Sequence, residues 1–243
     1  MKRKVSRSKQ QVSITWLGHS AFKFELPSGF VFLVDPWLEN PKAPPGAKDI
    51  ARVDAIFISH GHADHIGNAV EVAKRTGARV FANYEVSVFL RNSGISSVDG
   101  MNKSGTVKVD GVQVTMVDAT HSSGIETGEQ FLAGGDPAGF VFRFENGFTA
   151  YHAGDTGVFG DMRLIAELYK PDLAILPIGG FYTMGPLEAA KACRLLMPAY
   201  ILGMHYGTFP VLAGNPQELK RLLPGPLKRR LLVINPGDTV KLP

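Results

Sequence analysis

The sequence predicts an α/β protein in which two mixed β-sheets pack face to face with helices on their outer faces. Two observations predict this layout: strand hairpins dominate the start of each half of the chain, and each half then changes to alternating helices and strands. In addition, the 243 residues are 44% hydrophobic and no low-complexity linker divides them, so one sizeable core is expected. We therefore predict a flexible basic tail over residues 1–10 and a single domain over residues 11–243.

The first third of the chain has the pattern of short strands. Three runs rich in β-branched and aromatic residues are separated by the turn sequences Gly-His-Ser and Pro-Ser-Gly, which predicts an antiparallel meander. These runs are Val12–Leu17, Ala21–Leu26 and Phe30–Val34. The next strand is expected over Asp54–Ser59, because its almost continuous apolar run is typical of a strand buried on both faces.

The middle of the chain mixes helices and hairpins. Ile66–Thr76 has apolar residues at helical spacing and ends at Gly77, a residue typical of helix C-termini. A short strand and a short helix are expected over Arg79–Ala82 and Glu85–Asn92. Two hairpins turn at Asp-Gly and Asn-Gly pairs, and they are expected over Val107–Val117 and over Gly139–Glu145 with Phe148–His152.

The C-terminal third predicts regular alternation. Helices are expected over Phe159–Tyr169, Pro186–Met197 and Pro216–Leu223, and strands over Leu173–Pro177, Tyr200–Met204, Leu231–Ile234 and Thr239–Leu242. Two stretches, Leu38–Ala51 and Ile125–Ala138, fit neither pattern. Long irregular loops in compact domains are usually either functional rims or disordered, and these two are long enough to enclose a pocket.

Charge and cysteine content limit the classes of function. The formal net charge is +4, and five positive charges lie in the tail, at Lys2, Arg3, Lys4, Arg7 and Lys9. The nearly neutral remainder does not favour nucleic acid as a partner. The residues after the tail lack the apolar run of a signal peptide, so we expect a cytoplasmic protein without a membrane span. The single cysteine, Cys193, lies in a helical pattern and is expected to be a buried apolar residue.

Histidines are concentrated at one point of the chain. The stretch SHGHADHIG places His60, His62, Asp64 and His65 within six positions, although the chain has only seven histidines. It follows a predicted buried strand and precedes a predicted helix. His60 and His62 face the same side if the backbone stays extended, whereas Asp64 and His65 turn toward the helix. This loop, which we call the metal loop (residues 59–67), is therefore expected to offer ligands to two metal sites.

Three further donors follow predicted strands, and each stands beside glycine or serine. They are His121 in DATHSSG, Asp155 in HAGDTG and His205 in GMHYGT. Each is compatible with an ordinary loop position when taken alone. Their repeated placement at strand ends favours a shared metal centre, since catalytic zinc sites commonly take three protein ligands plus water.

The order of these motifs resembles the metallo-β-lactamase superfamily, whose fold is an αββα sandwich. The motifs are His-x-His-x-Asp-His at 60–65, then a lone His121, Asp155 in Gly-Asp-Thr and a late His205, and the match runs from Val12 onward. Within the superfamily, GHSAFKFE at 18–25, VDPW at 34–37 and GGFYTMGPLEA at 179–189 resemble the cytoplasmic metal-dependent hydrolases related to L-ascorbate-6-phosphate lactonase.

The resemblance implies a role for each residue. One metal ion would be held by His60, His62 and His121, the other by Asp64, His65 and His205, and Asp155 would bridge the two. Asp64 and Asp155 would also be catalytic, because they would orient the hydroxide between the ions. Asp35 would orient the metal loop through hydrogen bonds without binding the metal itself. The alternative is that Asp35 only forms the turn before Pro36.

Other polar residues have open roles. His19 lies in the turn between the first two strands, where substrate contact or proton transfer and a structural role are both open. For His152 a core or supporting position is favoured. Backbone N–H groups at Thr183–Gly185, before the helix at Pro186, are either an anion site or an ordinary helix start.

The resemblance therefore implies a hydrolase that cleaves a small anionic ester, lactone or phosphodiester with a metal-bridged hydroxide. Two ions roughly 3.5–4 Å apart would generate this nucleophile at neutral pH. Zinc is the first expectation, with manganese, nickel or iron as alternatives, because histidine and carboxylate ligands suit all four. The oligomeric state stays open, a homo-oligomer included, and neither nucleic acid nor membrane is expected as a partner.

Two alternatives belong to other classes of function. An RNA-processing phosphodiesterase of the same superfamily would need an extended basic surface, and only the tail is basic. A non-catalytic metal-binding protein is disfavoured because no ligand of the motif is missing. The chain also differs from antibiotic-destroying members, many of which use a cysteine ligand, and from flavodiiron relatives, which carry Glu at the position of His62.

Overall fold

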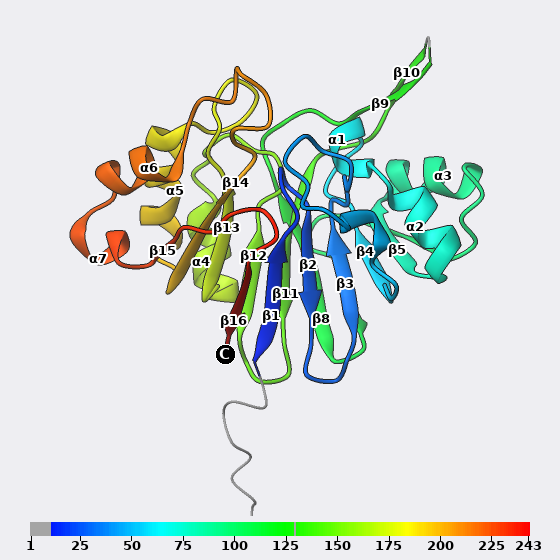
Figure 1. The fold of residues 1–243 in the computed structure, drawn as a ribbon, viewed down its shortest axis with the longest axis horizontal. Helices are drawn as coiled ribbons and strands as arrows, with labels where there is room; N and C mark the ends of the chain where they lie inside the picture. The colour runs from blue at the N-terminus through cyan, green and yellow to red at the C-terminus, as the bar shows by residue number, and fades with distance from the viewer. Residues whose placement is uncertain (1–10, 129) are drawn as a thin grey trace, which may run out of the picture.

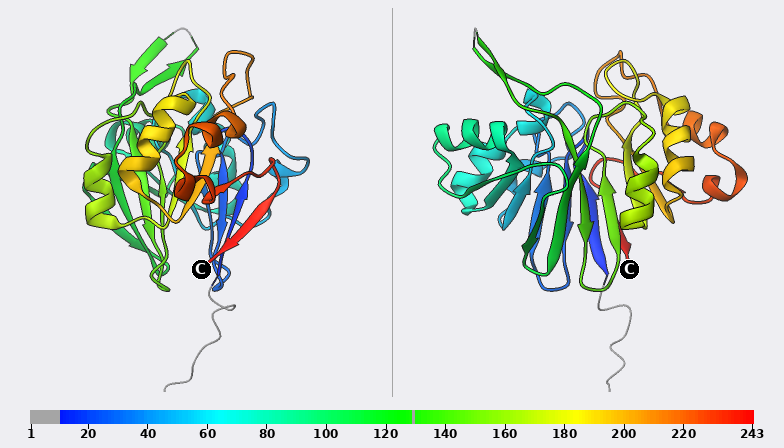
Figure 2. Two further views of the ribbon diagram at one scale, coloured as in Figure 1. Left: turned by 90° about the vertical axis from the view of Figure 1, so that its left-hand side faces the viewer. Right: turned by 180° about the vertical axis from the view of Figure 1, so that it is seen from behind.

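Two seven-stranded β-sheets pack face to face, and helices cover the outer face of each. The computed structural model describes residues 11–128 and 130–243, so the predicted tail over residues 1–10 lies outside the described residues. The side and rear views show the same four layers (Figures 1 and 2). The predicted αββα sandwich of two mixed sheets is therefore confirmed.

The first sheet begins as an antiparallel meander and continues with parallel strands. Its order is β16-β1-β2-β3-β4-β5-β6, in which β3 to β6 are parallel. The bounds are β1 Val12–Trp16, β2 Phe22–Glu25, β3 Val31–Val34, β4 Ala55–Phe57, β5 Arg79–Asn83, β6 Val98–Met101 and β16 Thr239–Leu242. Strand β16 returns from the end of the chain and pairs antiparallel with β1, so both ends of the described chain stabilise one sheet.

The second sheet has the same two-part construction. Its order is β15-β14-β13-β12-β11-β8-β7, with antiparallel pairs from β7 to β12 and parallel pairs from β12 to β15. The bounds are β7 Thr106–Val109, β8 Val112–Asp118, β11 Ala138–Arg143, β12 Thr149–His152, β13 Leu173–Pro177, β14 Tyr200–Met204 and β15 Leu231–Leu232.

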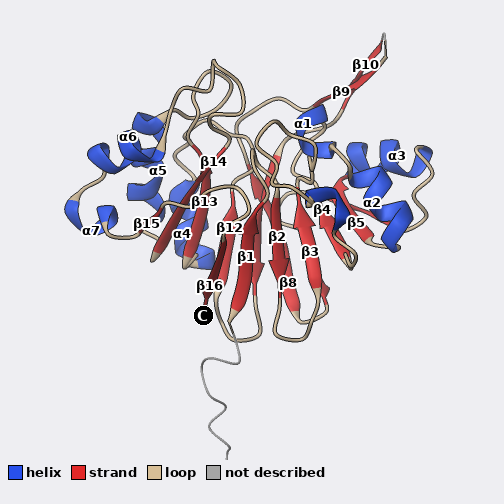
Figure 3. Cartoon of the chain, viewed as in Figure 1, coloured by secondary structure: helices blue, strands red, loops and turns tan. Residues whose placement is uncertain are grey.

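Helices bury the outer faces of both sheets (Figure 3). Helices α1 (Ala63–Ile66), α2 (Ala69–Thr76) and α3 (Tyr84–Asn92) cover the first sheet, and α4 (Met162–Tyr169), α5 (Pro186–Leu196), α6 (Pro216–Leu222) and α7 (Gly225–Lys228) cover the second. Cys193 lies in α5 and is buried as expected, and burial raises the pKa of its thiol to about 12.

Two expectations about local structure are corrected. The predicted helix Ile66–Thr76 is two helices, α1 and α2, that break at Gly67, where φ is 45°. A Cβ atom at Gly67 would lie 2.5 Å from Trp37 Cα, so only glycine allows the metal loop to pack this closely on the VDPW segment. The stretch Ile125–Ala138, expected to be irregular, contains a hairpin of β9 (Gly124–Thr127) and β10 (Gln130–Ala133), which projects from the body in Figure 1.

Phenylalanine rings from both sheets fill the space between them. Phe142 of the second sheet lies 4.9 Å from Phe32 and 5.1 Å from Phe57 of the first, measured between ring centroids. All three side chains are almost completely buried. Such offset and edge-on contacts fix the distance between the sheets, and therefore the relative positions of their strand ends.

Six strands that run in one direction end at the same edge of the sandwich. They are β1, β3 and β4 of the first sheet and β8, β12 and β14 of the second. The residues that follow them include His19, Asp35, the metal loop, His121, Asp155 and His205. The topology therefore delivers every predicted site residue to one edge, at the top of Figure 1.

We predict that Phe142→Ala lowers the free energy of unfolding by about 3–5 kcal/mol, because it leaves a cavity between the sheets. Urea unfolding of the two proteins measures the difference. Leu168→Ala is the control, since Leu168 in α4 is 68% exposed and should change stability by no more than about 0.5 kcal/mol. Equal effects of the two substitutions would contradict the role given to the interlayer aromatic core.

Candidate metal centre

The structure brings all seven predicted metal ligands together. Their donor atoms form three overlapping groups, and within each group these atoms lie within 4.8 Å of one another. The groups are His60, His62 and His121; His60, His65 and Asp155; and Asp64, His65 and His205 together with His19. Because His60 and His65 each occur in two groups, the donors form one continuous cluster.

The metal loop has the conformation needed to direct His60 and His62 to one side and Asp64 and His65 to another. His62 is extended, with φ −66° and ψ 149°, and α1 begins at the next residue. His60 and His62 therefore lie side by side, with His60 Nε2 2.9 Å from His62 Nδ1, while α1 carries Asp64 and His65. The Gly61 N–H donates to Ser123 Oγ, and a Cβ at Gly61 would lie 2.7 Å from Ile125 Cγ1, so the loop packs directly on the base of the β9–β10 hairpin.

The first group consists of neutral imidazoles. The ring of His121 lies 5.2 Å from the rings of His60 and His62, and both contacts are edge-on. Burial lowers the pKa of His60 well below its usual range, and the neighbouring His65 adds to the effect. Burial also lowers the pKa of His62 and of His121. Neutral rings keep a nitrogen lone pair, which is what a metal ligand needs.

The group of Asp64, His65 and His205 carries much of the charge of the cluster. Asp64 Oδ2 lies 3.8 Å from both His65 Nε2 and His205 Nε2. Burial alone would lower the pKa of both histidines, but the nearby carboxylates outweigh it. The Asp155 carboxylate is the main cause, and the pKa of His65 is raised well above its usual value and that of His205 to about 9. Without an ion, protons on these rings therefore balance the carboxylates.

Asp155 lies between the group of His60, His62 and His121 and the group of Asp64, His65 and His205. Its Oδ2 atom is 3.0 Å from His205 Nε2, 3.3 Å from His65 Nε2 and 3.7 Å from His121 Nε2. Burial would raise the pKa of this carboxyl, but the charges of His205 and His65 hold it well below its usual range. The side chain is thus an anion that reaches donors of both groups.

The donor set fits divalent metal ions. Asp155 Oδ1 is buried and forms no hydrogen bond with the described chain. Buried polar atoms without partners are rare in native proteins, and an ion is one of the accepted explanations. Imidazole and carboxylate donors suit Zn, Mn, Fe and Ni alike.

A buried network behind the metal loop orients two of the histidines. Asp35 accepts hydrogen bonds from the Ser59 N–H at 2.7 Å, from Ser59 Oγ at 2.7 Å and from His65 Nδ1 at 2.8 Å. Ser59 Oγ has only one hydrogen and gives it to Asp35, so it accepts from His60 Nδ1 at 2.9 Å. Both rings consequently turn Nε2 toward the cluster. The position of Asp35 agrees with its expected supporting role, whereas Ser59 was not expected.

His19 is held between two partners. Its Nε2 lies 2.9 Å from Asp64 Oδ2, and its Nδ1 lies 2.9 Å from Thr208 Oγ1. Burial lowers the pKa of His19 to about 4 although the hydrogen bond to Asp64 opposes this, so the ring is neutral at pH 7. A carboxylate only accepts, so Nε2 carries the hydrogen and Nδ1 accepts from the Thr208 hydroxyl. In this tautomer His19 orients Asp64 and offers no lone pair at Nε2.

His152 has a structural environment, as favoured above. Its Nε2 donates to Ser20 O at 3.1 Å and its Nδ1 accepts from the Gly154 N–H at 3.2 Å, so both ring nitrogens are satisfied. Burial lowers the pKa of this ring. His152 therefore ties β12 to the turn that carries His19.

The N–H groups considered for anion binding before α5 are largely engaged. Met184 N donates to Thr156 O at 3.1 Å, and Gly185 N donates to Glu188 Oε2 at 3.1 Å. The Glu188 carboxylate thus already occupies the start of the helix. The structure supports the ordinary helix start and not the anion site.

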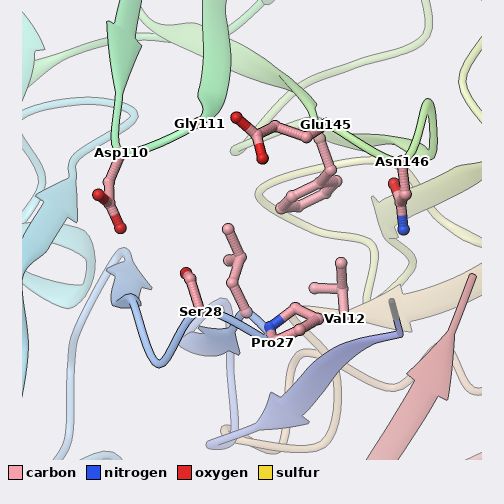
Figure 4. A pocket seen from close by; sticks show the side chains of 9 residues that line it. Val12, Pro27, Ser28, Asp110, Gly111, Glu145 and Asn146 are labelled. Atoms are coloured by element: carbon pink, nitrogen blue, oxygen red, sulfur yellow. The ribbon is translucent and has the colours of Figure 1, made fainter. Parts of the chain in front are cut away.

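A pocket opens beside the cluster. It has a volume of about 370 Å³ and is lined by Trp37, His62, Ala63, Asp64, Gly124, Glu126 and Phe209. A second pocket, of about 490 Å³, lies among the hairpin turns at the opposite edge and includes Ser28, Asp110 and Asn146 (Figure 4). Since none of the predicted ligands lines the second pocket, the first is the candidate substrate site.

Several residues of this site have no sequence motif that would have identified them. Ser59 and Thr208 act through hydrogen bonds, and their only signal is that each stands within three positions of a ligand histidine. Trp37 belongs to the VDPW motif, but the motif alone does not indicate that this residue lines the pocket. Glu126 of β9 and Phe209 of the loop after β14 line the pocket only because the folded chain brings these distant segments together.

In the described part of the chain, no helix has the length and apolar character needed to cross a membrane.

Comparisons with known proteins agree with the fold and the site. The family model of the Beta-lactamase superfamily domain matches residues 31–206. The UPF0173 metal-dependent hydrolase of Rubrobacter xylanophilus is 50% identical over 210 residues, which cover 86% of this chain and 87% of that protein. The UPF0173 metal-dependent hydrolase of Methanosarcina mazei is 44% identical over 232 residues, or 95% of this chain and 99% of that protein.

A solved structure is similar over the same extent. Igni18, a metallo hydrolase from Ignicoccus hospitalis, superposes with a TM-score of 0.84 and 38% identity, covering 96% of this chain and 99% of that chain. These relatives match nearly the whole chain, and their names describe metal-dependent hydrolases or a metallo hydrolase. The chain belongs to the β-lactamase superfamily and, within it, to the UPF0173 family of metal-dependent hydrolases.

Proposed function

We propose that this metal-dependent hydrolase uses two divalent ions to cleave a small anionic ester, lactone or phosphodiester. The observation that carries the proposal is the position of Asp155, whose Oδ2 atom lies between His121 of one donor group and His65 and His205 of the other. A single ion would not need a carboxylate within reach of both groups. Zinc is the first choice, and Mn, Ni or Fe would suit the same donors.

The ions and the side chains have separate tasks. When bound, two divalent ions lower the pKa of a water and polarise the bond under attack. His60, His62 and His121 would hold one ion, Asp64, His65 and His205 the other, and Asp155 both. Asp35 and Ser59 keep the rings of His65 and His60 in the orientation that these roles require.

Asp64 is the carboxylate that reaches the substrate. Its side chain is 28% exposed and lines the pocket, whereas Asp155 is buried. Burial would raise the pKa of Asp64, but His65, His19 and His205 lower it far below its usual value, so it is an anion. As an anion it accepts a hydrogen bond from the attacking water and thereby orients it. His19 fixes Asp64 through Nε2.

The pocket favours a small substrate over RNA. Its volume of about 370 Å³ lies at the lower end of the range for small-molecule sites. Binding of RNA depends on many Lys and Arg contacts to phosphates, and the lining residues include neither. Lactones, carboxylic esters and phosphodiesters all remain within the proposal, because the same centre can polarise each of them.

We predict that the purified protein holds close to two metal equivalents and that Asp155→Ala loses at least one of them. Hydrolysis of the best substrate should fall by about 100-fold or more in kcat/KM, because the bridging carboxylate is removed. Metal content is measured by plasma mass spectrometry after dialysis. Asp136→Ala is the matched control, since its side chain is 81% exposed and lies outside the cluster. Unchanged metal content and activity in Asp155→Ala would refute the two-ion centre.

A second substitution separates a positioning residue from a ligand. His19→Ala should keep both ions but lower kcat/KM by about 10²–10⁴, because Asp64 loses its partner and any proton that His19 transfers is lost. Metal content and kcat/KM are measured on the same preparation, with the melting temperature as a check on folding. Loss of an ion would make His19 a ligand, and unchanged kinetics would assign it a structural role.

A further inference from the structure

We propose that the pocket beside Asp64 recognises an uncharged, flat apolar group of the substrate, of the size of one aryl ring, which packs against Trp37 and Phe209. This inference rests on the proposed function, because it names the substrate class of the same site. The reacting, anionic end of the substrate would face the donor cluster. The aryl end would fill the outer part of the pocket.

Two loops that are far apart in the sequence build the aromatic wall. Trp37 follows β3, and Phe209 follows His205 on the loop after β14. Their ring centroids are 5.9 Å apart with an angle of 30° between the planes. His19 meets both rings edge-on, at 5.2 Å from Trp37 and 6.1 Å from Phe209. The apolar wall therefore begins directly beside the residue that holds Asp64.

The backbone of Trp37 is held by its neighbours. Its carbonyl accepts a hydrogen bond from Asn40 Nδ2 at 2.7 Å, and its N–H donates to Asp35 O at 2.8 Å. Gly67 packs against this backbone, and the indole ring contacts the rings of His19 and Phe209. A ring placed by such contacts loses less entropy when it binds a flat group than an unsupported one would.

Charge on the pocket lining excludes an anionic distal end. The two ionisable acids that line it are Asp64 and Glu126, and the lining contains no lysine or arginine. Phe209 is 38% exposed, so apolar ring surface is open to a ligand. A group that is flat and uncharged matches this lining better than a sugar phosphate or a dicarboxylate.

Three carboxylates that differ only at the distal end test the inference. Acetate, phenylacetate and 4-carboxyphenylacetate are titrated into the metal-loaded protein by calorimetry. We expect phenylacetate to bind at least 10-fold more tightly than acetate, because the ring gains the aromatic contacts. The added distal carboxylate should weaken binding several-fold relative to phenylacetate, because it meets Glu126.

Substitutions assign the effect to the wall. Trp37→Ala and Phe209→Ala should each weaken phenylacetate by about 5- to 30-fold and leave acetate unchanged. Phe181→Ala is the matched control, since Phe181 is a 75% exposed aromatic residue that does not line the pocket. Glu126→Gln should recover part of the affinity for 4-carboxyphenylacetate. Phe209→Ala decides the matter if Trp37→Ala fails to fold, as judged by its melting temperature.

The result that overturns the inference differs from the one that overturns the proposed function. Equal affinity for acetate and phenylacetate, or equal effects of Phe209→Ala and Phe181→Ala, would exclude the aryl subsite even in a protein with two ions and full activity. Loss of the two-ion centre or of hydrolysis would instead refute the proposed function, whatever the ratio of the two dissociation constants.

Discussion

The burial of the Asp155 carboxylate among histidines is the constraint on which the rest of the site depends. This side chain is 3% exposed, and its ion-pair partners in the described chain are His65, His121 and His205. A buried carboxylate is costly unless positive charge accompanies it. Imidazole meets this need in two ways, as a protonated cation or as a neutral ligand to a metal ion. When no metal ion is bound, the raised pKa values of His65 and His205 favour protonated rings, and these cations offset the charge of the buried carboxylate.

The fold holds this arrangement against local strain. His19, Asp35 and His205 have φ angles of 50°, 46° and 54°, in the left-handed region that costs such residues of order 1–3 kcal/mol each. Six strand ends and the aromatic layer between the sheets hold these positions. The packing energy of the core therefore offsets the backbone strain of the site. The His205 N–H donates to the His19 carbonyl, so two strained residues, one from each sheet, support each other directly.

The sequence predicted most of the fold and named seven of the eight clustered donors as metal ligands, since both follow from local patterns. Alternation of apolar residues identifies strands, and His60, His121, Asp155 and His205 stand just after them. Contacts between distant segments leave no local pattern in the sequence. His19 and Thr208 are 189 positions apart, and Trp37 meets Phe209 only in the folded chain. Likewise, the break at Gly67 arises from tertiary packing on Trp37. The spacing of apolar residues in the helix cannot predict such a contact.

The proposed function requires two ions in one cluster with Asp155 between them. Anomalous X-ray diffraction from crystals of the metal-loaded protein, recorded at the absorption edge of the bound metal, would locate these ions. We expect two peaks, one among His60, His62 and His121 and one among Asp64, His65 and His205, with Asp155 in contact with both. A single peak in fully loaded crystals, or two peaks with Asp155 bound to neither, would contradict the proposed function.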